Sequence, residues 1–198
     1  MFPQSFYKQD AISLAKSLIG QELIRHTEDG VTAGIIVETE AYRQDDEASH
    51  SFRGATKRNE VMFGPAGRAY IYFTYGMHYC MNVVAGEEGC AEAVLIRALE
   101  PTRGIELMRR RRKTTELHNL CSGPAKLVQA MGILKEQNGM SLMKDTLHIA
   151  PGAKPAPPIA STPRIGIKQA IDKPWRFIAT GSAYTTKHRF NKLAEPVN

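Results

Sequence analysis

The 198-residue sequence predicts an α+β fold, with helices flanking a mixed, mostly antiparallel β-sheet. Apolar residues recur at helical spacing near the start of the chain and again in its second half. Between those segments lie short apolar runs separated by turn sequences, which is the pattern of antiparallel strands. The length favours a single domain over residues 1–198, large enough to bury a core without disulfide bonds.

The first predicted element is a helix over residues 9–19, which Asp10 can cap and Gly20 can end. Two extended runs follow at residues 22–27 and 31–42, separated by an Asp-Gly pair. Because Asp-Gly between apolar runs is typical of a hairpin, these two runs are predicted to pair.

The middle of the chain contains a long loop and then three strands. Residues 43–68 are polar, charged and glycine-rich, and loops of this length inside a domain usually have a function. The runs at 69–73, 79–85 and 91–100 are predicted strands, with Pro101 ending the third. The turn between the first two makes them a second hairpin.

The remaining segments are predicted to be a basic stretch, a helix and a connector. Arginines crowd residues 103–113, and a short helix over 121–133 has Ser122 as its expected cap. Residues 150–161 are too rich in proline for a helix or a central strand, so they should form a surface connector. Two closing strands are expected, at residues 163–167 and 174–181.

Charge and cysteine content narrow the class of protein. The formal net charge of +6 favours an anionic partner such as nucleic acid. No two of Cys80, Cys90 and Cys121 stand in a C-x-x-C spacing, which argues against a disulfide framework or a zinc ribbon. No apolar run suits a signal peptide or a membrane span. We therefore expect a protein of the cytoplasm, or of the nucleus if its source is a eukaryote.

Two glutamates interrupt an otherwise apolar predicted strand, IIVETEAY. In an extended chain Glu38, Glu40 and Tyr42 lie on one face. A half-buried carboxylate there would have a raised pKa, as a general base near neutral pH requires. The alternative is a strand that leaves the core, with both glutamates exposed.

Arg97 interrupts another apolar run, AVLIRALE. An arginine in a core strand needs an acidic partner, and Glu40 is a suitable one. The pattern alone does not separate a catalytic pair from a structural ion pair.

The run YIYFTYGMHYCMN concentrates tyrosines around a turn. Tyr75 and Met77 stand at that turn, where they could act as a wedge between DNA base steps. Tyr42 and Tyr72 could stack on either side of a planar base. The alternative interpretation, ordinary core aromatics, suits Tyr70 and Phe73.

The long loop carries both acidic and basic groups. A metal site could be drawn from Asp45, Glu47 and His50, but no second histidine stands at metal-binding spacing, so no metal is expected. Basic side chains that could hold phosphates are Arg53, Lys57 and Arg58.

Six blocks occur in a fixed order: VETEAY, DEASHS, RN..MF, YIYFTYGMHYCMN, LIRALEP and LCSGPAKL. Together they resemble the 3-methyladenine (alkyladenine, or alkylpurine) DNA glycosylase family from about Leu23 to Lys126, and more weakly through PRIGI and RFIATGS. The resemblance implies one compact domain around an antiparallel sheet, with a β-hairpin that enters the DNA minor groove. It also implies an enzyme that removes 3-methyladenine, 7-methylguanine, hypoxanthine and ethenoadenine from duplex DNA in base excision repair, without metal or organic cofactor. A monomer is expected of an enzyme that slides on DNA.

The matched blocks imply roles for individual residues. Glu40 would activate the attacking water, which Arg97 would help to place. Tyr42 and Tyr72 would stack on the flipped base, with His50 against its edge.

By the same resemblance, Tyr75 would fill the gap left by the flipped nucleotide, with Met77 beside it. Asn82 would oppose the exocyclic amine of guanine and so discourage attack on the normal base. Glu38 is expected to be a supporting residue. Lys126, at the start of the helix in LCSGPAKL, joins the loop arginines and lysine as a phosphate-binding candidate, as does the RRRRK run.

The sequence departs from the family pattern at four places. The loop between Tyr42 and His50 is a residue short, Lys57 stands where a proline is common, and His78 stands where another aromatic residue is usual. The last predicted strand, RFIATGSAYTT, matches only loosely. These departures bear on the substrate range.

No lysine stands inside the blocks around Glu40, so no Schiff base and no strand-cleaving lyase step are expected. Two other functions stay open. One is a metal-dependent nuclease or phosphatase that uses the acidic residues Glu38, Glu40, Asp45, Asp46 and Glu47. The other is a non-catalytic module that binds damaged DNA.

Overall fold

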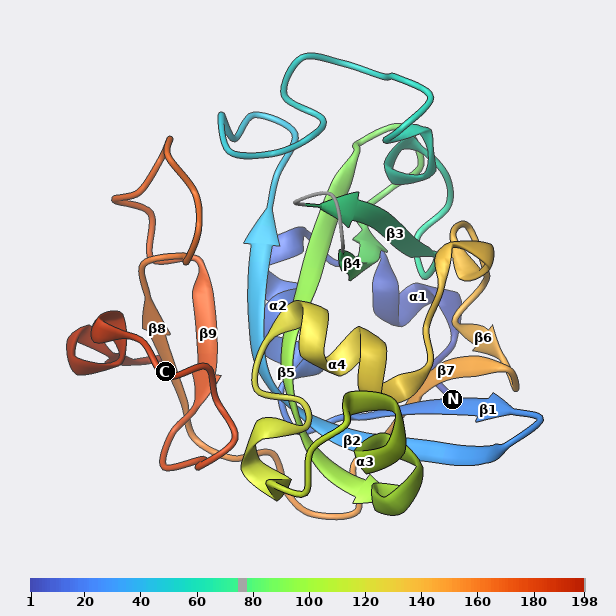
Figure 1. The fold of residues 1–198 in the computed structure, drawn as a ribbon. Helices are drawn as coiled ribbons and strands as arrows, with labels where there is room; N and C mark the ends of the chain where they lie inside the picture. Colours follow the sequence, from blue (N-terminus) through green and yellow to red (C-terminus); the bar gives the residue numbers. More distant parts are fainter. Residues whose placement is uncertain (75–77, 198) are drawn as a thin grey trace.

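Strand β2 (Gly30–Tyr42) is the strand around which the sheet is assembled (Figure 1). In this computed structural model, which describes residues 1–74 and 78–197, β2 pairs with three strands. β1 (Glu22–Thr27) and β9 (Arg176–Ala179) lie along successive parts of one edge, and β5 (Glu92–Arg103) runs along the other edge. The long strand therefore reaches from the first hairpin to the region of the candidate site.

The sheet continues outward from β2 in both directions. One path has the order β10-β8-β9-β2-β1-β7-β6, and the other runs from β2 through β5 and β4 to β3. The remaining strands are β3 (Ala69–Thr74), β4 (His78–Ala85), β6 (Met143–Lys144), β7 (Leu147–Ala150), β8 (Ile159–Thr162) and β10 (Glu195–Val197). Every pair that the described strands form is antiparallel, so the sheet is antiparallel rather than mixed, and the α+β class is confirmed.

Few helices cover this sheet. The α-helices are α1 (Gln4–Tyr7), α2 (Ala11–Leu18), α3 (Ile105–Arg112) and α4 (Pro124–Met131), and the 3₁₀ helices are η1 (Glu60–Phe63), η2 (Leu117–Asn119), η3 (Lys135–Gln137) and η4 (Arg189–Leu193). In Figure 1, α2 lies behind β2 and β5, whereas α4 lies in front of β5. No helix among the described residues is long and apolar enough to cross a membrane.

The predicted cap of α2 is present. The Asp10 carboxylate accepts hydrogen bonds from the backbone N–H groups of Ile12 and Ser13, at 2.9 and 3.1 Å. These bonds satisfy donors that the first turn of a helix leaves free. The buried face of α2 then packs Leu14 and Leu18 into the main apolar core.

The two faces of β2 have different roles. The Thr39 hydroxyl donates to the backbone carbonyl of Ala15 at 2.9 Å, so the face that carries Thr39 is turned toward α2. Glu38 and Glu40, offset by one residue, contact Arg97 on the other face. The alternation expected from the sequence is confirmed.

The predicted end of β5 at Pro101 is wrong, because the strand continues to Arg103. In the described residues β4 pairs with the Glu92–Leu95 part of β5 alone, so one edge of β5 is open at Pro101. On the other edge, Pro101 lies opposite Gly34 at a register shift. A proline costs little where the sheet requires no backbone N–H.

Ser122 is not the cap of α4. Gly123 occupies that position without a side-chain hydrogen bond, and Pro124 begins the helix, where its missing N–H does no harm. The Ser122 hydroxyl instead accepts a hydrogen bond from Lys126 at 3.3 Å.

Two predictions for the C-terminal third are wrong. Residues 163–167 form no strand, because the Ile165 N–H donates to the Glu40 carboxylate and not to a neighbouring strand. Strand β8 begins inside the predicted connector, where β9 and β10 supply partners on its two edges. The strand at Arg176–Ala179 lies inside the predicted 174–181 segment.

Candidate active site

Strands β2 and β5 bring two glutamates against one arginine. Glu38 and Glu40 are both 0% exposed, and Arg97 is 5% exposed. Arg97 Nε donates to Glu38 Oε1 at 2.8 Å, and its Nη1 donates to Glu40 Oε2 at 3.1 Å. The alternative in which the strand leaves the core with both glutamates exposed is therefore wrong. Both carboxylates belong to a buried charge network.

Glu40 accepts hydrogen bonds from three donors. Its Oε2 receives the Tyr42 hydroxyl at 2.8 Å as well as Arg97, and its Oε1 receives the Ile165 N–H at 2.7 Å. A carboxylate has about four accepting positions, so one position on Oε1 is left for a further donor such as water. All three donor residues line a cavity, which places Glu40 directly behind its wall.

Glu38 is held more tightly than Glu40. Its Oε1 also accepts from Arg176 Nε at 2.7 Å, and its Oε2 accepts from the Thr186 N–H at 2.6 Å. Burial by itself would raise the pKa of Glu38, but the Arg97 and Arg176 guanidinium groups outweigh burial, and the pKa lies below its ordinary value. Glu38 therefore stays charged and fixes Arg97 from the side away from Glu40.

Glu38→Gln should weaken the dependence of the unfolding free energy on pH in the acid range. Because the folded-state pKa is lowered, the carboxylate contributes stability above its unfolded pKa of about 4.3, and this contribution is lost as the pH falls through the folded-state pKa. We expect the variant to lose about 1.5–3 kcal/mol of unfolding free energy at neutral pH. The difference should shrink as the pH falls below about 4. Urea unfolding across that range measures it, and a difference independent of pH would contradict the assignment.

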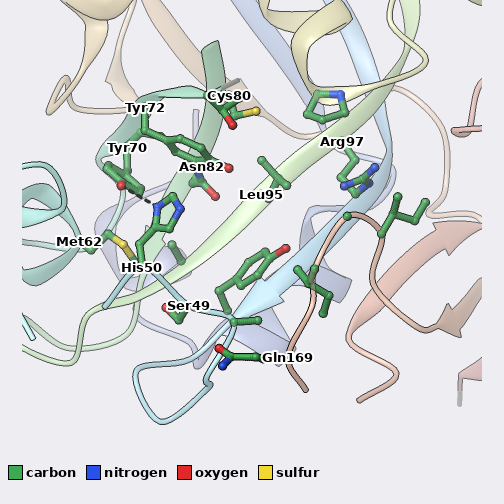
Figure 2. Close-up of a pocket in the computed structure, with 18 of the residues that line it drawn as sticks. Ser49, His50, Met62, Tyr70, Tyr72, Cys80, Asn82, Leu95, Arg97 and Gln169 are labelled. Atoms are coloured by element: carbon green, nitrogen blue, oxygen red, sulfur yellow. Dashed lines mark hydrogen bonds between the residues drawn. The ribbon is translucent and has the colours of Figure 1, made fainter. Parts of the chain in front are cut away.

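A cavity with a volume of about 650 Å³ opens beside this network (Figure 2). Its size lies within the range of small-molecule sites, roughly 300–1,000 Å³. The long loop around Ser49 and His50, side chains of β3, β4 and β5, and residues 165–169 form most of its lining. Tyr42 at the end of β2, Met62 in η1 and Pro124 at the start of α4 complete it.

One wall of the cavity is an ordered cluster of polar and aromatic side chains. His50 Nδ1 lies 3.0 Å from the Tyr70 hydroxyl, drawn as the dashed line in Figure 2, and its ring meets the Tyr72 ring edge-on with centroids 4.5 Å apart. Partial burial and the nearby Arg58 lower the pKa of His50, which favours the neutral imidazole at pH 7. Burial raises the pKa of Tyr70 to about 12, so its phenol stays protonated.

Asn82 lies in the same wall, in β4 opposite Tyr70. It is 4% exposed, and its amide nitrogen donates to the Tyr70 backbone carbonyl at 3.2 Å. The amide is thereby fixed in orientation while it still lines the cavity.

Tyr42 lines the cavity with its hydroxyl donated to Glu40. Burial, and next to it the negative charge of Glu40, raise the pKa of Tyr42 well above its ordinary value, so the phenol remains a donor. The guanidinium of Arg164 lies over the Tyr42 ring, 4.7 Å from its centroid. Tyr42 and Tyr72, the two predicted stacking residues, thus border one cavity.

The predicted phosphate-binding residues differ in their surroundings. Arg53 and Lys57 are exposed on the long loop. Arg58 donates to the Phe73 carbonyl at 3.1 Å, and its guanidinium lies 5.6 Å from the Tyr72 ring centroid. Lys126 contacts the side chains of Asn119 and Ser122, one turn into α4.

Part of the RRRRK run is structural. Arg111 donates to the Ala130 carbonyl at 3.2 Å, and Arg112 donates to the Leu120 carbonyl at 3.1 Å. These bonds hold α3 against α4 and the segment before it. The two guanidinium groups are therefore engaged within the fold.

The predicted wedge residues Tyr75 and Met77 lie outside the described residues. The strands that precede and follow them, β3 and β4, pair antiparallel as far as Thr74 and His78. Tyr70 in β3 is buried, but Phe73 is 48% exposed, so the prediction of Phe73 as a core aromatic is wrong.

Four of the five carboxylates named for the metal-dependent alternative, all except Glu47, are paired with arginines. Asp46 pairs with Arg164 in the same way that Glu38 and Glu40 pair with Arg97, and Asp45 lies 3.1 Å from Arg43. In residues 1–74 and 78–197 no three histidine, cysteine or carboxylate side chains gather as a metal site would require.

The structure adds residues that the sequence reasoning missed. Residues 165–169 form a cavity wall, and Lys168 is among them, although it stands outside the blocks in which no lysine was found. Arg164 and Arg176 are fully buried partners of carboxylates. A signal existed for Arg176, which interrupts the apolar run WRFIA as Arg97 interrupts its own run, whereas Arg164 in STPRIGIK carried no such signal.

Most of the chain is similar in sequence to known proteins. Residues 5–183 match the family described as methylpurine-DNA glycosylase (MPG). A protein of Methanoculleus marisnigri is 50% identical over 189 residues, covering 93% of this chain and 98% of its own length. Proteins of Carboxydothermus hydrogenoformans and Agrobacterium fabrum are each 49% identical, covering 94% and 93% of this chain and 99% and 92% of their own lengths. All three carry the provisional name 3-methyladenine DNA glycosylase.

Proposed function

The chain belongs to the methylpurine-DNA glycosylase family, and from this premise we propose that it is a monofunctional DNA glycosylase of base excision repair. It would flip damaged purines out of duplex DNA and hydrolyse their N-glycosidic bond. One observation carries the proposal: the buried Glu40 carboxylate, held by Arg97 and Tyr42, adjoins a cavity of about 650 Å³ whose lining includes three tyrosines.

Flipping is the first step, because an enzyme cannot reach the sugar carbon C1′ of a stacked nucleotide. Unstacking costs a few kcal/mol, least for a damaged or mispaired base. In this proposal Tyr75 fills the vacated place in the stack, and Met77 lies beside it.

The cavity would then select the base. Tyr42 and Tyr72 stack on the purine, and stacking on an aromatic ring contributes about 1–3 kcal/mol per base. His50 contacts its edge, and Asn82 opposes the exocyclic amine of guanine. The proposed substrates are 3-methyladenine, 7-methylguanine, hypoxanthine and ethenoadenine.

Glu40 would supply the chemistry. Breaking an N-glycosidic bond builds positive charge on the sugar, as in other glycoside hydrolysis. A carboxylate can stabilise that charge and accept a proton from the attacking water. The free accepting position on Oε1 is where this water would bind, with Arg97 helping to place it.

The proposed substrate is double-stranded DNA bound by a monomer, with residues 1–198 as one domain. Arg53, Lys57, Arg58 and Lys126 would contact phosphates. No metal or organic cofactor enters this mechanism.

Release of hypoxanthine from a duplex that contains one such base tests the proposal. We expect the wild-type protein to release the base in the presence of EDTA, and borohydride to trap no covalent complex despite the position of Lys168. Activity that EDTA abolishes would favour the metal-dependent alternative. Binding of damaged duplexes without release of hypoxanthine or of an alkylated purine would favour the non-catalytic one.

A further inference from the structure

Asp46 and Arg164 form a buried ion pair beneath the cavity wall. Both side chains are 0% exposed. Arg164 donates to both oxygens of the Asp46 carboxylate, with Nη2 at 3.0 Å from Oδ1. Lys173 Nζ lies 3.8 Å from the same carboxylate. Neither acid nor arginine belongs to the Glu38, Glu40 and Arg97 network.

Arg164 contacts the wall that holds Tyr42. Its Nη1 also donates to the Ala41 carbonyl at 2.9 Å, and its guanidinium lies over the Tyr42 ring. The next residue, Ile165, gives its N–H to Glu40. The ring that borders the cavity and the carboxylate behind it are therefore both held by residues 164 and 165.

Asp46 organises a second segment of the site, the loop that leads to His50. Its Oδ1 accepts the Ala48 N–H at 3.2 Å, and its carbonyl accepts the Ser49 N–H at 2.8 Å. Ser49 and His50 both line the cavity. One ion pair thus joins two loops, separated by 118 positions in the chain, that both line the site.

We propose that Arg164 and Asp46 are positioning residues, which set the plane of Tyr42 and the separation of the two loops so that a flipped purine fits between them. This inference rests on the proposed glycosylase function. A buried ion pair adds little net stability compared with apolar residues of the same size, whereas its directed hydrogen bonds fix geometry. A bidentate arginine that also bonds a backbone carbonyl restrains both loops at once.

The test is single-turnover release of hypoxanthine at a series of enzyme concentrations. It gives two separate quantities: the maximal rate, and the half-saturating concentration, which is the enzyme concentration at half of the maximal rate. Arg164→Met should raise that concentration and lower the maximal rate by about 10- to 100-fold, because a displacement near 1 Å has costs of this order. Asp46→Asn keeps the side-chain shape, so it should change the half-saturating concentration and the maximal rate in the same directions but by smaller factors. If Arg164→Met does not fold, Asp46→Asn provides the test instead.

A double-mutant cycle with Tyr42→Leu shows whether the pair acts through the ring. Once the ring is absent, Arg164→Met or Asp46→Asn should change the half-saturating concentration little further. Arg25→Met is the matched control, because Arg25 is a buried arginine that donates to the Thr146 carbonyl and does not line the cavity. It should lower the melting temperature while both kinetic constants stay at wild-type values.

Two results would overturn the inference while wild-type activity upholds the proposed function. One is a double variant in which Arg164→Met or Asp46→Asn raises the half-saturating concentration as much beside Tyr42→Leu as it does in the wild-type protein. The other is an Arg164 or Asp46 variant that loses stability as the Arg25 control does and keeps wild-type kinetics. An inactive wild type would instead reject the proposed function itself.

Discussion

Glu40→Gln should abolish base release while duplex binding is retained. The substitution removes the negative charge and the accepting position available to water, which together are expected to supply about 10²–10⁴-fold in rate. The surface of the protein is unchanged, since Glu40 is 0% exposed, and so the contacts with DNA should persist. Single-turnover release and fluorescence anisotropy on the same duplex measure the two effects.

The Gln variant also carries a structural cost that needs a control. An amide has one oxygen, whereas Glu40 accepts from Tyr42 and Arg97 on Oε2 and from Ile165 on Oε1, so one donor must lose its acceptor. Thr39→Val is matched to it, because it removes a buried hydrogen bond to Ala15 on the opposite face of the same strand. That variant should release base at the wild-type rate. Retained cleavage in Glu40→Gln would reject Glu40 as the group that activates water.

Arg97→Met should be the most destabilising single substitution in the site. It leaves Glu40 with two neutral donors and no cation, while Glu38 keeps Arg176 and the Thr186 N–H. Removing one partner of a buried ion pair costs about 3–5 kcal/mol of unfolding free energy, because a charge is left buried without compensation. Urea unfolding at neutral pH measures the loss, and base release should fall with it.

The double variant Arg97→Met with Glu40→Gln separates charge from packing. A neutral amide needs no cation. The double variant should therefore lose less unfolding free energy than the two single variants lose in sum, by at least about 1 kcal/mol. Additive losses would mean that the arginine acts mainly through packing. Thr39→Val combined with Arg97→Met is the comparison in which additivity is expected, since their side chains lie on opposite faces of the sheet.

Local pattern was sufficient for much of the fold. The Asp-Gly turn between apolar runs predicted the β1–β2 hairpin, and alternation along β2 predicted that Glu38 and Glu40 share one face, opposite to that of Thr39. The rule that a buried arginine needs an acid predicted the contact between Arg97 and Glu40. These predictions succeeded because they depend on periodicity and on the cost of burying charge.

The same patterns failed where a neighbour in space changed their meaning. Pro101 was expected to end its strand, but no strand in the described residues lies against that edge of β5. Residues 163–167 carry apolar side chains suited to a strand, yet the Ile165 N–H is taken by the Glu40 carboxylate. Neither outcome depends on the local sequence.

Local patterns in the amino-acid sequence were enough to predict the α+β class, the hairpins and the pairing of Glu40 with Arg97. The three-dimensional structure was needed to show that both glutamates are buried, that Glu38 also contacts Arg97, and that Asp46 pairs with Arg164 across 118 positions. The physical reason is that side-chain alternation is a property of a few adjacent residues. Loop contacts depend instead on how β8 and β9 dock along the edge of β2, which brings residues 164 and 165 to the site.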